Sequence, residues 1–188
     1  MSDRAQRSQK PRIALLRAFA DLVQKHHYDQ IRVADIVRRA NVGRSTFYEH
    51  FRGKDAILTS SIAGPLAVLA DSIQPKTDVS ALIELLEHFW INRALARGIL
   101  LGPVRRKTIA GLVSQVELRL KSNVHSMTGS PLIPRRLAAI QVAEVMIAPV
   151  TAWLIGESRC TPEALARALP RAACAVLAAS YDRTTLTR

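Results

Sequence analysis

Residues 33–51 read VADIVRRANVGRSTFYEHF, and this stretch decides the fold. Apolar residues at three- and four-residue steps predict a short helix that starts near Val33, and a second from about Arg44 to His50. Between them, Ala40-Asn41-Val42-Gly43 predicts a tight turn, because asparagine adopts the left-handed conformation more readily than most residues. Two short helices joined by such a turn form a helix-turn-helix.

The second of these helices is predicted to have one apolar and one polar side. Phe47 and Phe51 lie four residues apart and should face the core beside Ile36 and Phe19. The opposite side carries Arg44, Ser45, Thr46, Tyr48, Glu49 and His50. Arginine can pair with guanine O6 and N7, threonine can contact thymine or phosphate, and tyrosine and histidine can donate to phosphates. This side suits DNA, although an ordinary solvated polar face is the alternative.

The rest of the chain predicts helices as well, with no convincing alternation typical of strands. The expected helices span about 11–27, 33–40, 44–50, 54–73, 79–100, a short segment near 105, 109–125, 131 or 134–155, and 162–181. Gly64-Pro65 is expected to kink or interrupt the helix over 54–73, and Pro149 to kink the one that ends at 155. Asp78 and Thr161 are the expected N-caps of the helices that follow them, and Gly156 is the expected left-handed residue after 155. The sequence therefore predicts an all-α fold of about nine helices.

These helices divide into parts of different character. Residues 1–10 are polar and charged and are expected to form a flexible basic arm. Residues 11–53 are expected to form a three-helix unit that contains the helix-turn-helix. Residues 54–188 are long enough for a larger helical bundle, and the helix that begins at Lys54 should join the two units.

The charge is strongly positive and unevenly spread. The 188 residues carry a net charge of +12 with a pI near 10.8, which favours an anionic partner such as nucleic acid, with a membrane surface as second choice. Residues 1–58 hold 12 Lys and Arg against 6 Asp and Glu, and residues 59–188 hold 15 against 9. Half of the excess thus lies in the first third, which favours an N-terminal nucleic-acid surface over a basic surface that serves only solubility.

The two cysteines and the hydropathy of the sequence bear on the cellular compartment of the protein. Cys160 and Cys174 have neither metal-ligand spacing nor a CxxC pattern, so both are expected to be reduced thiols, with Cys174 packed in a helix. The N-terminus has no apolar signal segment, and no run of about 18 apolar residues lacks a charge. A cytoplasmic protein without a membrane segment is predicted.

Motifs for catalysis or for a bound cofactor are not apparent in the sequence. It shows no paired nucleophile and base, no paired carboxylates, no phosphate-binding loop and no metal motif, so neither an enzyme nor a cofactor is predicted. His26 and His27 are adjacent on a helix, so their side chains point in different directions and cannot chelate a metal alone.

The N-terminal third resembles the signature of TetR-type transcriptional repressors. The resemblance covers about residues 11–58 and rests on Phe19, Val33–Val37, Ala40–Val42, Ser45–Phe51 and Lys54–Leu58. It implies an all-helical homodimer whose N-terminal domain binds a double-stranded DNA operator. It also implies that the larger C-terminal domain binds a small-molecule effector and forms the dimer through its last two helices.

Carried over by position, the resemblance also implies site residues. Base or sugar-phosphate contacts fall on Arg44, Ser45 and Thr46, and DNA-backbone contacts fall on Tyr48, His50, Lys54 and Arg32. Two positions depart from the family pattern. Ile31-Arg32 stands where a Ser or Thr usually precedes the helix, and Gly43 stands where a capping Ser is common. Glycine still serves as a cap at a cost of a few tenths of a kcal/mol, so only the cap of the first helix is in question.

The candidate effector pocket lies among the helices of the larger half. The candidate lining residues are Leu66, Leu69, His88, Phe89, Asn92, Met146 and Trp153, with Trp90 nearby. Plain core packing is the simpler interpretation of each of them. His88 and Asn92 are more suggestive than the others, because polar groups within an apolar stripe need partners.

Together these features predict a ligand-responsive transcriptional regulator, most simply a repressor that a small molecule releases from a pseudo-palindromic operator. A constitutive or architectural DNA-binding protein without an effector is the main alternative. It would have no closed cavity and a weak sequence preference. A small helical enzyme is the third possibility, and no catalytic motif supports it.

Overall fold

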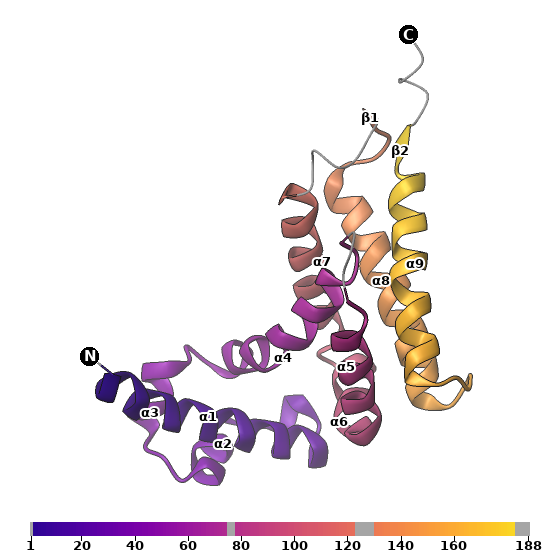
Figure 1. The fold of residues 1–188 in the computed structure, drawn as a ribbon. Helices are drawn as coiled ribbons and strands as arrows, with labels where there is room; N and C mark the ends of the chain where they lie inside the picture. The colour runs from indigo at the N-terminus through magenta and orange to yellow at the C-terminus, as the bar shows by residue number, and fades with distance from the viewer. Residues whose placement is uncertain (1, 75–77, 123–129, 183–188) are drawn as a thin grey trace.

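The computed structural model describes residues 2–74, 78–122 and 130–182. Within these ranges the chain forms nine α-helices, one short 3-10 helix and two strands of two residues each. Helices α1, α2 and α3 lie together at one end, and α7, α8 and α9 stand side by side at a steep angle to them (Figure 1). The predicted all-α fold is confirmed.

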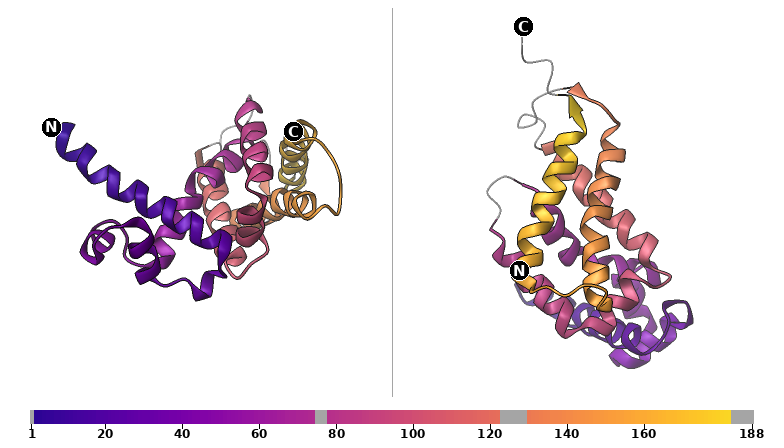
Figure 2. Two further views of the ribbon diagram at one scale, coloured as in Figure 1. Left: turned by 90° about the horizontal axis from the view of Figure 1, so that it is seen from below. Right: turned by 90° about the vertical axis from the view of Figure 1, so that its right-hand side faces the viewer.

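The N-terminal unit comprises α1 (Ser2–Lys25), the 3-10 helix η1 (Tyr28–Gln30), α2 (Val33–Ala40) and α3 (Arg44–His50). The predicted start of the first helix at Pro11 is wrong, since α1 begins at Ser2 and contains Pro11. Most residues before Pro11 favour helices, and a proline removes only one backbone hydrogen bond donor. Helix therefore covers the segment that was expected to be a flexible arm, and α1 projects beyond its neighbours (Figure 2).

Both ends of α2 are fixed locally. At its C-terminal end Asn41 has a φ of 53°, the left-handed conformation that the sequence predicts for the turn. At its N-terminal end the Asp35 carboxylate accepts a hydrogen bond of 3.0 Å from the backbone N–H of Arg32. Asp35 thus supplies the cap that the missing Ser or Thr leaves open, because a carboxylate in the first helical turn satisfies a free backbone donor.

Helix α4 (Lys54–Asp71) leads from the N-terminal unit into the bundle (Figure 1). It runs through Gly64-Pro65 as one helix, so of the two expected effects, a kink or an interruption, the interruption is wrong. Ile62, Leu66 and Leu69, on both sides of this point, are all buried. Their packing holds the helix together despite the backbone hydrogen bond that Pro65 cannot make.

Two helices replace the single one expected over 79–100, namely α5 (Ser80–Ile91) and α6 (Arg93–Leu100). They meet at Asn92, whose φ of −102° and ψ of 35° are not helical. The Asn92 side-chain amide donates to the backbone carbonyl of His88 at 3.0 Å, and such bonds compete with regular helix geometry. Val79 occupies the cap position expected of Asp78, although the Asp78 carboxylate accepts from the Ser80 N–H at 3.0 Å.

A single helix, α7 (Arg105–Ser122), stands where a short and a longer helix were expected. Thr108 lies at the predicted gap and is buried, with its hydroxyl bonded to the Val104 carbonyl at 3.2 Å, so the helix continues through it. The expected end at His125 and most of the following loop lie outside the described residues.

The chain ends with α8 (Arg135–Ile155) and α9 (Pro162–Ala179). Gly156 adopts the expected left-handed conformation with a φ of 82°, and the Thr161 hydroxyl caps α9 by accepting from the Ala164 N–H at 3.2 Å. Pro149 lies inside α8. The strands β1 (Ser130–Pro131) and β2 (Tyr181–Asp182) pair in antiparallel fashion, and they are too short to give a sequence signal.

Helix α8 is long and apolar enough to cross a membrane by length and composition. Half of that stretch is buried inside the protein, where α8 packs between α7 and α9 (Figure 1), so its apolar character is that of a core helix. Cys174 lies on α9 but is exposed, as is Cys160, so the prediction that Cys174 is packed is wrong.

Candidate nucleic-acid interface and ligand pocket

Two aromatic anchors fix how α3 is turned. Phe47 is completely buried and Phe51 is 4% exposed, and their ring centroids lie 5.8 Å apart. They share a core with Ile36 and Phe19, both buried as the spacing predicts. Because one side of α3 is fixed in this core, its opposite side must face outward.

That outward side presents the polar residues named from the sequence. Arg44, Ser45, Tyr48 and Glu49 are exposed. Thr46 and His50 are partly buried at its edges. The Arg44 guanidinium lies 5.9 Å from the centre of the Tyr48 ring, so the two side chains stack on one surface. The structure therefore brings the α3 candidates together on a single exposed face.

The other two candidates, Arg32 and Lys54, lie outside α3, at the starts of α2 and α4. Arg32 is exposed at the start of α2. The Lys54 ammonium donates to the Tyr28 carbonyl at 2.8 Å and lies 4.1 Å from the centre of the Tyr28 ring. An ammonium has three donors, so Lys54 can hold this contact and still reach a phosphate.

A junction at Asp55 connects the N-terminal unit with the bundle. The Tyr28 hydroxyl, from η1, donates to Asp55 Oδ1 at the start of α4. Lys107, from α7, forms an ion pair of 2.6 Å with the same oxygen. Burial, followed by the hydrogen bond to Asp55, raises the pKa of Tyr28. The hydrogen bonds from Lys107 and then Tyr28 lower the pKa of Asp55. Lys107 is 52 residues from Asp55, and no local pattern in the sequence indicates this contact.

Asp55→Asn is expected to weaken this junction in a pH-dependent way. Because folding lowers the pKa of Asp55, its charge stabilises the fold above the carboxyl's unfolded pKa, and this contribution disappears as the pH falls through the folded value. The Asp55 side chain is 65% exposed, so we expect a loss below about 1 kcal/mol at neutral pH. Urea unfolding should show the loss at neutral pH, and the loss should disappear once the pH lies below the lowered pKa of the folded carboxyl. The exposed Glu157→Gln variant is the control, and an equal loss at both pH values would contradict the assignment.

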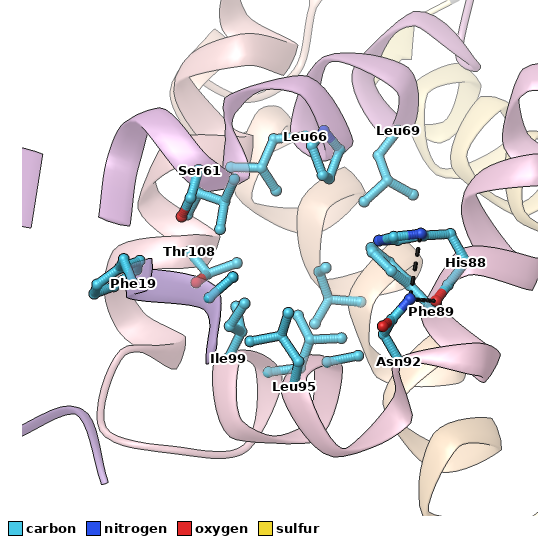
Figure 3. Close-up of a pocket in the computed structure, with 16 residues that line it drawn as sticks. Phe19, Ser61, Leu66, Leu69, His88, Phe89, Asn92, Leu95, Ile99 and Thr108 are labelled. Atoms are coloured by element: carbon cyan, nitrogen blue, oxygen red, sulfur yellow. Dashed lines mark hydrogen bonds between the residues drawn. The ribbon is translucent and has the colours of Figure 1, made fainter. Parts of the chain in front are cut away.

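A pocket of about 110 Å³ lies where α1 meets the bundle (Figure 3). Helices α1 and α4 supply one part of the lining: Phe19, Ala20, Ser61, Ile62, Pro65, Leu66 and Leu69. Helices α5 and α6, with Asn92 between them, supply the other: His88, Phe89, Asn92, Leu95, Ala96, Ile99 and Leu100. Thr108 of α7 and Ile147 of α8 complete it. Five of the predicted candidates are among them: Leu66, Leu69, His88, Phe89 and Asn92.

Met146 and Trp153 do not line this pocket. Met146 is fully buried in the core of α8. The Trp153 indole lies 4.8 Å from that of Trp90 between ring centres and donates to the Cys160 carbonyl at 3.0 Å, beside a separate hollow. Both follow the helical pattern of α8, which shows that a residue is buried but not which neighbour it meets.

Sequence reasoning missed the contributions of α1 and α6. Phe19 and Ala20 were assigned only to the DNA-binding unit, and the residues of α6 were merged into one longer helix. The pocket nonetheless extends to α1, where the Phe19 ring packs edge-on against Tyr28 at 6.3 Å. One cavity thus touches both units of the chain. Among the described residues, no group of three or more His, Cys, Asp or Glu is placed to hold a metal ion.

Residues 15–60 match the family described as "Bacterial regulatory proteins, tetR family". The N-terminal domain belongs to the TetR family. Two curated HTH-type regulators are similar to part of the chain. One is "Uncharacterized HTH-type transcriptional regulator YxbF" of Bacillus subtilis, 37% identical over 65 residues, which are 34% of this chain and 17% of that protein. The other is "HTH-type dhaKLM operon transcriptional activator DhaS" of Lactococcus lactis, 40% identical over 45 residues, 24% of each chain. The matched segment spans less than a quarter of either relative.

Solved structures extend the likeness to the whole fold. A TetR transcriptional regulator from Streptococcus agalactiae has a TM-score of 0.61 at 25% identity, over 89% of this chain and 96% of that one. A TetR-family regulator from Syntrophomonas wolfei, described as putative, has a TM-score of 0.60 at 19% identity, over 91% and 96%. FadR from Bacillus subtilis in complex with stearoyl-CoA has a TM-score of 0.56 at 19% identity, over 87% and 98%. The chain therefore has the TetR-type all-α fold.

Proposed function

We propose that this protein is a cytoplasmic, dimeric DNA-binding regulator that a small molecule releases from its operator. The exposed polar face of α3, which Phe47 and Phe51 hold outward within a TetR-type domain, carries this proposal. In it, Arg44, Ser45 and Thr46 enter the major groove. Tyr48, His50, Lys54 and Arg32 contact the DNA backbone. Repression follows most simply, because a bound dimer would block access to the DNA beneath it.

The dimer is proposed to form through α8 and α9, whose outer faces lie side by side (Figure 2). Leu137, Ile140 and Ile155 on α8 are 46%, 38% and 44% exposed, so the helix offers apolar side chains that a partner could cover. The neighbouring face of α9 consists largely of exposed alanines: Ala164, Ala168, Ala172 and Ala175. Small residues allow helices of two protomers to approach closely, and exposed aliphatic residues gain from burial.

The residues proposed for this interface are not the regularly spaced large apolar residues of α8 and α9. Met146, Trp153 and the leucines of α9 at 165, 169 and 177 are apolar and regularly spaced, but all are buried within the protomer. They belong to the protomer core. A partner subunit would instead meet the exposed faces described above.

The pocket offers a route from ligand to DNA. A ligand there would contact Phe19 and Ala20 of α1, and Leu66 and Leu69 of α4, in addition to α5 and α6. Ligand binding would favour the arrangement of α1 and α4 that fits the occupied pocket. The fraction of molecules in the conformation that binds DNA would then fall. The complex of FadR with stearoyl-CoA, a relative in fold, supports an effector in a bundle of this type.

Selection of bound sequences from random duplex DNA tests the proposal. A dimer with two α3 helices should select a pseudo-palindrome whose half-sites lie one helical turn or a multiple of a turn apart. Selection without a sequence preference would instead indicate the constitutive or architectural protein.

Arg44→Ala is expected to weaken binding to the selected operator by about 1–3 kcal/mol, roughly 5- to 150-fold, and to relax the preference at one base position. A fluorescence-anisotropy titration at fixed salt measures this effect. Arg106→Ala, which removes an exposed arginine from α7, is the matched control and should lose little. Equal affinity of Arg44→Ala and the parent protein would show that Arg44 does not read a base.

A further inference from the structure

We infer that the pocket takes a small, uncharged and mainly apolar molecule, of about the size of one ring, whose single polar group meets His88 and Asn92. This inference rests on the proposed function only in treating the pocket as the effector site. The lining contains no Asp, Glu, Lys or Arg. A charged group held among these apolar side chains would lose hydration without gaining an opposite charge, which disfavours anionic and cationic ligands. His88 is exposed and Asn92 is partly buried, so the two lie at the open side of the pocket.

The hydroxyls in the lining leave little for a ligand to bind. The Ser61 hydroxyl donates to the Leu58 carbonyl at 2.7 Å, and the Thr108 hydroxyl donates to the Val104 carbonyl at 3.2 Å. Both protons are therefore used inside their own helices, so these hydroxyls can only accept from a ligand. The side chains that can both donate and accept are those of His88 and Asn92, which lie together on one side of the pocket (Figure 3).

The hydrogen bonds between these two residues determine what they offer. The Asn92 Nδ2 group contacts the His88 carbonyl at 3.0 Å and His88 Nδ1 at 3.3 Å. An amide nitrogen only donates, so this contact is a hydrogen bond in the tautomer whose Nδ1 accepts and whose proton lies on Nε2. The pair therefore presents one donor, His88 Nε2–H, and one acceptor, Asn92 Oδ1. A primary amide or hydroxyl complements both, whereas a carboxylate would face the Asn92 oxygen with a second acceptor.

The size of the cavity limits the rest of the ligand. An apolar cavity of about 150 Å³ is known to hold benzene, and this pocket of about 110 Å³ is of the same order. Its volume matches a single ring or a short aliphatic chain with one polar substituent. A long acyl chain joined to phosphates is both too large and too highly charged for the described lining.

Gly111 of α7 lies behind Leu66, which lines the pocket. A methyl group added at Gly111 would come within 2.9 Å of Leu66 Cδ1, so Leu66 would have to move. Because Leu66 lines the pocket, Gly111→Ala should reduce its volume without introducing a new lining residue. Gly64→Ala is the matched control, since its added methyl group meets nothing within 4 Å.

Calorimetric titration of the DNA-free protein with benzamide, phenol, toluene, benzoate and stearoyl-CoA tests the inference. Benzamide and benzoate have nearly the same shape, and we expect benzamide to bind at least about tenfold more tightly, which corresponds to about 1.4 kcal/mol. Asn92→Leu should weaken benzamide but not toluene. Gly111→Ala should weaken both, and Gly64→Ala should weaken neither. Circular dichroism verifies that each variant is folded.

Three results would overturn the inference: no binding of any neutral compound, benzoate or stearoyl-CoA binding as tightly as benzamide, or benzamide binding that is insensitive to Gly111→Ala. Operator release is measured separately with the selected DNA. If benzamide binds but does not release the protein from the operator, the ligand class assigned to the pocket stands. The pocket's role in the proposed regulation is then overturned.

Discussion

Ala168→Arg is expected to leave the protein folded but monomeric, and to weaken operator binding by about 10²- to 10⁴-fold. Ala168 is exposed on the alanine-rich face of α9, and α9 packs on α8, which exposes a leucine and two isoleucines. An arginine there would place a long charged side chain at the centre of the proposed two-fold contact, where it would also meet its own symmetry copy. Linking two half-site contacts raises affinity by about two to four orders of magnitude, and this advantage is lost when the protomers separate.

Sedimentation and operator titration check this expectation together. The variant should sediment as a monomer at concentrations where the parent is a dimer, with an unchanged helical circular dichroism spectrum. Ala110→Arg is the control, because Ala110 is equally exposed but lies on α7, away from the outer face of α8 and α9 (Figure 1). A dimeric Ala168→Arg variant would place the interface elsewhere, and a monomer with full operator affinity would show that dimerisation is not needed for binding.

Features with local causes were predicted well. The left-handed Asn41, the cap at Thr161, the end of α8 at Gly156 and the burial of Phe47 and Phe51 each depend on residues within a few positions of one another. Their physical reasons, backbone conformation, a free N–H at a helix start and helical spacing, are present in the sequence itself.

Features that depend on contacts between distant residues were not predicted. The sequence around Asn92 has unbroken helical periodicity, yet the chain bends there. The pocket combines residues of α1 with residues of α6, some 75 positions later, and Lys107 reaches Asp55 from another helix. Helical periodicity identifies the buried side of each helix but not its neighbour, which is why Met146 and Trp153 were assigned to the wrong cavity.

The second large effect concerns the core that holds α3. Phe47→Ala is expected to lower the free energy of unfolding by about 3–5 kcal/mol, because Phe47 is completely buried and its removal leaves a cavity between α3 and the helices it packs on. The aromatic contact with Phe51, at 5.8 Å, is lost as well. Since small domains are stable by only about 5–15 kcal/mol, this variant would have lost a large part of its stability.

Tyr48→Ala separates stability from DNA contact at the neighbouring position. Tyr48 is 49% exposed and touches Phe47 only edge-on, at 5.4 Å between ring centres, so its removal should cost about 1 kcal/mol or less. Urea unfolding should therefore show a much larger shift for Phe47→Ala. Operator titration at a temperature where both variants are folded should show the larger loss for Tyr48→Ala, because its hydroxyl is assigned to a phosphate. Equal losses of stability would mean that α3 is not held by its inner face, and the orientation of the whole proposed DNA surface would then be wrong.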